Sequence, residues 1–107
     1  MDYQYQVASV QDMGLPLQII FVHPNFGKQG GAAQQAETER LAAAAKDAGL
    51  PGRVAVVWPE GNKDGFKFIA PPTSCLWFDQ YTGFSELVAL RSNTLTLTSA
   101  EAASSVR

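Results

Sequence analysis

The sequence has a single cysteine, Cys75, and a single histidine, His23. One cysteine cannot form an intrachain disulfide, which excludes a small disulfide-stapled scaffold. Only 17% of the residues are charged, and eight lysines and arginines stand against ten acidic residues, for a net charge of −2. These cations are scattered along the chain, whereas proteins that bind nucleic acid or anionic membranes show basic clusters. We therefore expect neither nucleic acid nor a membrane as a partner.

Long apolar runs are also missing, because none approaches the ~20 residues that a membrane-spanning helix needs. The first six residues lack the basic stretch and apolar core of a secretion signal, so we expect a soluble, cytoplasmic protein. The hydrophobic fraction of 46% is that of a globular chain, and no repeat or low-complexity linker divides it. We expect one domain over residues 1–98, followed by a tail, residues 99–107, that forms a short helix or frays.

The clearest pattern in the sequence is a strand, a helix and a second strand in succession. Residues 17–22 are almost all apolar, which is typical of a strand that is covered on both faces. Alanine and glutamine give residues 32–48 a high helix propensity, and Gly49 followed by Pro51 is a typical helix stop. Residues 53–58 form a second apolar run. This succession predicts a βαβ crossover, whose two strands are parallel.

Three further segments alternate in the manner of strands. They are residues 3–10, 66–70 and 94–98. The first predicts a hairpin with the strand before the helix, the second a hairpin with the strand after it, and the third an edge strand. Residues 84–91 fit either a short helix or a strand. We predict an α/β fold, with α+β as the alternative, built on a mixed five- or six-stranded sheet with one principal helix.

Polar residues follow both strands of the predicted crossover. Ligands of open α/β sheets bind outside the carboxyl ends of parallel strands, so this edge is the expected binding site. Lys63 and Asp64 also lie in the second loop. The candidate ligand-binding residues are His23, Asn25, Lys28, Gly30, Gly31, Glu60 and Asn62.

The segment Gly27–Gly31 leads into the predicted helix. Free N–H groups and the helix dipole favour an anion at such a place, and Lys28 adds a positive charge. The spacing of the glycines nevertheless matches neither common phosphate-binding fingerprint. A flexible connection into the helix is the simpler interpretation, and binding of a small phosphate-type anion is the alternative.

His23 is also the one candidate for general acid or base chemistry, because histidine exchanges protons near neutral pH. Glu60 or Asp64 would orient it in a small hydrolase, and the same three residues would bind a divalent ion only if their loops converged. Cys75 is the other candidate nucleophile, although no charged neighbour in the sequence activates it. The sequence specifies no catalytic constellation, and it predicts no metal and no cofactor.

The second half of the chain is rich in aromatic residues. One helix covers only one face of a sheet, so we expect an exposed apolar patch that a homodimer would bury. The leading interpretation is a non-catalytic binding or protein-interaction module that self-associates. The alternatives are the anion site at Gly27–Gly31 and the small hydrolase that uses His23 with Glu60, Asp64 or Cys75.

Overall fold

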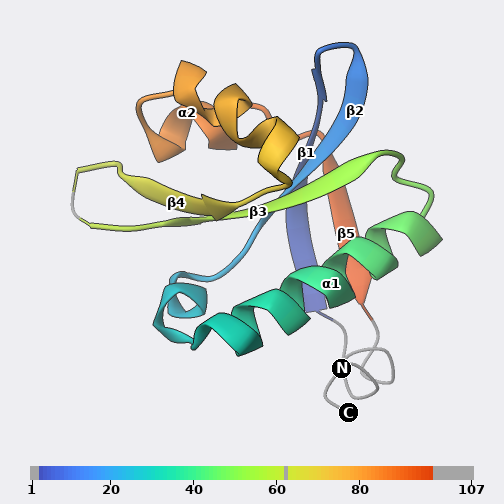
Figure 1. Ribbon diagram of the computed structural model, residues 1–107, viewed down its shortest axis with the longest axis horizontal. Helices are drawn as coiled ribbons and strands as arrows, with labels where there is room; N and C mark the ends of the chain where they lie inside the picture. Colours follow the sequence, from blue (N-terminus) through green and yellow to red (C-terminus); the bar gives the residue numbers. More distant parts are fainter. Residues whose placement is uncertain (1–2, 62, 98–107) are drawn as a thin grey trace.

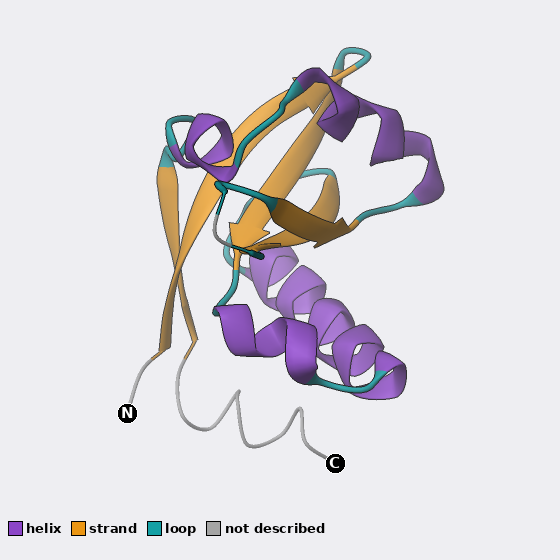
Figure 2. Cartoon of the chain, turned by 90° about the vertical axis from the view of Figure 1, so that its left-hand side faces the viewer, coloured by secondary structure: helices purple, strands orange, loops and turns teal. Residues whose placement is uncertain are grey.

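The computed structural model describes residues 3–61 and 63–97 and places one mixed sheet between two helical layers (Figures 1 and 2). The sheet has five strands in the order β4-β3-β2-β1-β5. The predicted fold class is confirmed, with one main helix and a mixed sheet. In chain order the elements are β1 (Tyr3–Asp12), β2 (Leu15–Phe21), the 3-10 helix η1 (Pro24–Lys28), α1 (Gly31–Asp47), β3 (Arg53–Pro59), β4 (Phe66–Ile69), the 3-10 helix η2 (Pro72–Gln80), α2 (Phe84–Val88) and β5 (Asn93–Leu97).

β1 and β2 form the predicted antiparallel hairpin, with Asp12 opposite Leu15. The turn consists of Met13 and Gly14, whose φ angles are 55° and 80°. Positive φ at both central residues is what a two-residue type I′ turn requires, because its twist matches that of the strands. β1 therefore continues to Asp12, beyond its predicted end at residue 10.

β2 and β3 pair in parallel, and α1 forms the connection between them. The helix ends where the sequence predicts. Gly49 has a φ of 84°, and the N–H of Leu50 donates to the C=O of Ala45 at 2.9 Å. The left-handed conformation of Gly49 turns the chain so that the N–H of Leu50 satisfies a carbonyl group that the end of a helix leaves free. The βαβ unit is thus confirmed.

α1 covers one face of the sheet (Figure 1). On the helix side that faces the strands, Leu41 and Ala45 are fully buried. Thr38 is half-buried, and Ala48, just past the end of the helix, is exposed. The small side chain of Ala45 lets the helix axis approach the strands closely. The core on this face consists of Val7, Ile20, Val22, Phe26, Leu41, Ala45, Val56, Trp58 and Leu95.

The opposite face is covered by η2 and α2 (Figure 2). Phe78 of η2 stacks on Phe68 of β4 with ring centroids 4.1 Å apart, and Leu87 of α2 is fully buried. The sequence allowed either a helix or a strand over residues 84–91, and the structure has the helix α2 there. The expectation that an aromatic face of the sheet stays uncovered is therefore wrong. The aromatic second half of the chain supplies its own cover.

A chain of polar side chains crosses the middle of the sheet. Gln18 is only 2% exposed, and its Oε1 accepts from the hydroxyl of Ser9 at 2.5 Å. Its Nε2 donates to the C=O of Pro51 at 2.9 Å, and Asn93 donates to Ser9 at 2.7 Å. These bonds join β5, β1, β2 and the loop before β3. The buried amide of Gln18 is thereby satisfied, as buried polar groups must be.

No helix in the described ranges is long and apolar enough to cross a bilayer. The fifth strand, Asn93–Leu97, is an edge strand as predicted. Residue 98 and the predicted tail, residues 99–107, lie outside the described part of the chain.

Replacing Leu41 by alanine tests the packing of α1. Because Leu41 is fully buried against the sheet, Leu41→Ala should lower the free energy of unfolding by about 2–5 kcal/mol in a denaturant titration. Leu76→Ala is the matched control, since Leu76 is 77% exposed and its loss should change the value by less than about 0.5 kcal/mol. Equal effects of the two substitutions would contradict this orientation of the helix.

Candidate functional site

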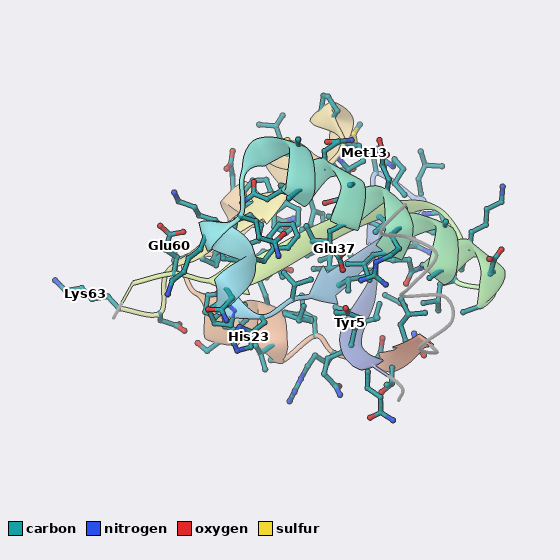
Figure 3. The ribbon with its side chains drawn as sticks, turned by 90° about the horizontal axis from the view of Figure 1, so that it is seen from below. Tyr5, Met13, His23, Glu37, Glu60 and Lys63 are labelled. Carbon is teal, nitrogen blue, oxygen red and sulfur yellow. The ribbon has the colours of Figure 1, made fainter. Side chains whose placement is uncertain are left out.

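β2 and β3 finish side by side at one end of the sheet, because they are parallel neighbours. Val22, just past β2, still donates its N–H to the C=O of Val57 at 2.9 Å. The chain then leaves β2 through η1 and leaves β3 through the loop to β4. Figure 3 shows His23, Glu60 and Lys63 toward this end of the molecule. The two loops that carry the predicted polar residues therefore share one end of the sheet.

His23 shapes the start of η1. Its Nδ1 accepts a hydrogen bond from the N–H of Asn25 at 3.0 Å, and its C=O accepts from the N–H of Phe26 at 2.9 Å. Both bonds cap the first turn, where N–H groups lack partners within the helix. His23, Asn25 and Lys28 are all exposed. The contacts of the His23 ring that the structure defines thus belong to the helix cap.

η1 is fixed to the sheet by aromatic contacts. The ring of Phe26 lies 4.7 Å from that of Trp58, and the two residues are each only 4% exposed. Gly27 lies directly against the indole, since a Cβ atom at this position would stand 2.6 Å from Nε1 of Trp58. That Nε1 is buried and has no hydrogen-bond partner among the described residues.

An open cleft of about 440 Å³ lies beside this contact, and we call it the Trp58 cleft. In the first turns of α1, Gln34 contributes an amide whose Nε2 donates to the C=O of Phe26 at 3.0 Å. Lys67 and Glu60 form an ion pair of 3.3 Å and are both well exposed, so they stand at the rim. The residues that line the cleft are Gly27, Gln34, Trp58, Glu60, Phe66, Lys67, Phe68 and Ile69.

Only one of the predicted ligand-binding residues lines this cleft, namely Glu60. Asn62 lies outside the described residues. The rest are exposed residues of η1 and of the start of α1. They are His23, Asn25, Lys28, Gly30 and Gly31.

The start of α1 has the features on which the anion prediction rests. Gly30 caps the helix without a side-chain hydrogen bond, and the first turn has no acidic residue. A Cβ at Gly30 or Gly31 would meet nothing within 4 Å, so the space in front of the helix is open. These features fit an anion but none of them is specific for one, and anion binding at Gly27–Gly31 stays a prediction.

The candidate catalytic groups each have another contact. Asp64 accepts hydrogen bonds from the N–H and the hydroxyl of Ser85, at 3.0 and 2.6 Å, at the start of α2. Glu60 pairs with Lys67. The thiol of Cys75 lies 3.6 Å from the C=O of Pro71. Within the ranges that the structure describes, no three His, Cys, Asp or Glu residues are grouped so as to hold a metal.

Sequence reasoning missed Trp58, Gln34 and Lys67 as members of a site. Trp58 is the last buried position of β3 and has the signature of a core aromatic residue. Lys67 is its direct partner across the β3–β4 hairpin, so the hairpin register alone places the two together. Gln34 carried no signal, because its position depends on how α1 lies over the sheet. No family model, curated protein or solved structure matches this chain.

Gly27→Ala tests the contact beneath η1. The added methyl group would meet the indole of Trp58, so the substitution should lower the free energy of unfolding by about 1–3 kcal/mol. Gly31→Ala is the matched control in open space. It should leave stability unchanged or raise it by up to about 1 kcal/mol, because alanine favours the helix. Thermal denaturation of both variants distinguishes these results, and a neutral Gly27→Ala would show that η1 does not press on Trp58.

Proposed function

We propose that this chain is a non-catalytic binding module and that the Trp58 cleft is its binding site. The carrying observation is the indole N–H of Trp58, a buried donor without a partner among the described residues, on a residue that also lines an open cleft. A buried donor left unpaired costs about 1–3 kcal/mol. A ligand that displaces Gly27 from the indole and accepts from this N–H would remove that cost.

The lining of the cleft supports the same proposal. Ligand sites combine apolar walls with a few polar groups that set orientation. Here the side chains of Trp58 and Ile69 supply apolar surface, while Gln34, Glu60 and Lys67 supply an amide and two opposite charges. The cleft also lies at the end of the sheet where β2 and β3 finish, the usual place for ligands in α/β proteins.

The predicted homodimer stays a prediction. Its original reason was an uncovered aromatic face, and η2 and α2 cover that face. Among the described residues, the strands with an unpaired side are β4 and β5, at the two edges of the sheet. A second copy that extends the sheet would pair at one of these edges.

The indole N–H signals of the two tryptophans test the proposed site. We would titrate the protein with a library of small carboxylic acids, amides and blocked dipeptides and record two-dimensional NMR spectra. Ligands that enter the cleft should shift the indole signal of Trp58 and the side-chain amide signal of Gln34. The indole of Trp77, on the other face of the sheet, should stay in place.

Two charge-reversed variants provide the control for this titration. Lys67→Glu removes the cation of the cleft and should weaken binding of the carboxylic acids. Lys63→Glu makes the same change in the exposed β3–β4 loop, away from the lining, and should leave binding unchanged. Shifts at Trp77 alone, or no shift at Trp58 with any compound of the library, would reject the cleft as the binding site.

A further inference from the structure

β4 is an edge strand of four residues, Phe66–Ile69, and all four line the Trp58 cleft. Figure 1 shows it at the margin of the sheet. An edge strand presents backbone N–H and C=O groups that a further strand can bind. Which groups these are follows from the pairing of β3.

The backbone groups of Val57 face β2, since its C=O accepts from Val22. Groups along a strand alternate in direction, so those of Trp58 face β4. Two residues further on, the N–H of Glu60 also points toward the β4 side, because it donates to the C=O of Gly65 at 2.9 Å. Lys67, the partner of Trp58, therefore points its backbone groups inward to β3. By the same alternation Phe66 and Phe68 point theirs outward, away from the sheet.

The side chains give the outer edge a chemistry of its own. Directly paired residues share a face, so Lys67 and Ile69 lie on the face of Trp58 and Val56, where the cleft is. Lys67 is 64% exposed along its side chain. A strand added beside β4 would place alternate side chains over the cleft, and the one opposite Lys67 would meet its ammonium group.

We propose that the ligand of the Trp58 cleft is an extended peptide segment of a partner protein, which adds to β4 as a sixth strand. This inference rests on the proposed function. Phe66 and Phe68 would each donate and accept one main-chain hydrogen bond, and an acidic side chain of the peptide would lie opposite Lys67. Strand addition is an established mode of peptide recognition, with main-chain bonds giving affinity and alternate side chains giving specificity.

The positions of the outward groups favour a peptide over a compact small molecule. Phe66 and Phe68 are two residues apart, so their groups repeat at about 6–7 Å, the repeat of an extended chain. A second copy of β4 is disfavoured by charge. The symmetric antiparallel pairing that uses both Phe66 and Phe68 places Lys67 opposite Lys67 of the second copy, and like charges directly opposite are destabilising.

The test begins with selection of linear peptides from a phage-displayed library on the immobilised intact protein. The selected sequences should carry Asp or Glu at one fixed position. Each residue of the best peptide is then N-methylated in turn. In strand addition, alternate residues of the peptide point their N–H groups toward β4 and the residues between them point away. N-methylation should therefore lower the affinity roughly tenfold or more at the residues that face β4, and change it little at the others.

Amide hydrogen exchange provides the second measurement. In the free protein the amides of Phe66 and Phe68 should exchange faster than those of Lys67 and Ile69, and the peptide should slow them. Lys67→Glu should change the selected acidic position to Lys or Arg, while Lys63→Glu should leave the selection unchanged.

Several outcomes would overturn the inference. These are no enriched peptide, losses on N-methylation without a period of two, or protection of Phe68 that rises with protein concentration alone and so reports a second copy. If the small compounds shift the Trp58 indole but no peptide is enriched, the proposed function survives and strand addition fails. If a peptide protects Phe68 without moving the Trp58 signal, the cleft itself is rejected.

Discussion

The parallel pairing of β2 with β3 is the constraint on which the rest of the structure depends. Parallel neighbours cannot be joined by a tight turn, so the chain must cross over, and α1 is that crossover. The pairing also fixes which loops meet, because both strands finish at the same end of the sheet. η1 and the β3–β4 loop are brought together there, and the Trp58 cleft lies between the elements that follow them.

Within that end of the molecule, a single close contact links local structure to the site. Phe26 anchors η1 on Trp58, and Gly27 lets the backbone come down onto the indole where a side chain would not fit. The tryptophan is thereby buried, although its N–H keeps no partner among the described residues. The same ring thus completes the core under α1 and forms a wall of the cleft, which connects fold stability with the proposed binding.

The candidate site shows how far sequence reasoning reaches. The rule that ligands gather at the ends of parallel strands led to the end of the sheet where the Trp58 cleft lies and to Glu60, which lines it. It did not lead to Gln34, which depends on the position of α1, or to Trp58, which has the pattern of an ordinary core residue. The expected uncovered face was wrong for a related reason. η2 and α2 are short and irregular in pattern, so their role as a second layer is visible only when they lie on the strands.

The sequence by itself determined the elements whose signals are local. Glycine at 49 ended the helix because only a left-handed residue continues the chain there, Met13 and Gly14 closed the first hairpin, and the apolar runs specified buried strands. Tertiary structure alone decided the strand order, the cover on the second face and the direction in which each edge residue points. These features depend on contacts between residues far apart in the chain, such as Gly27 with Trp58, for which no periodicity or turn signal exists.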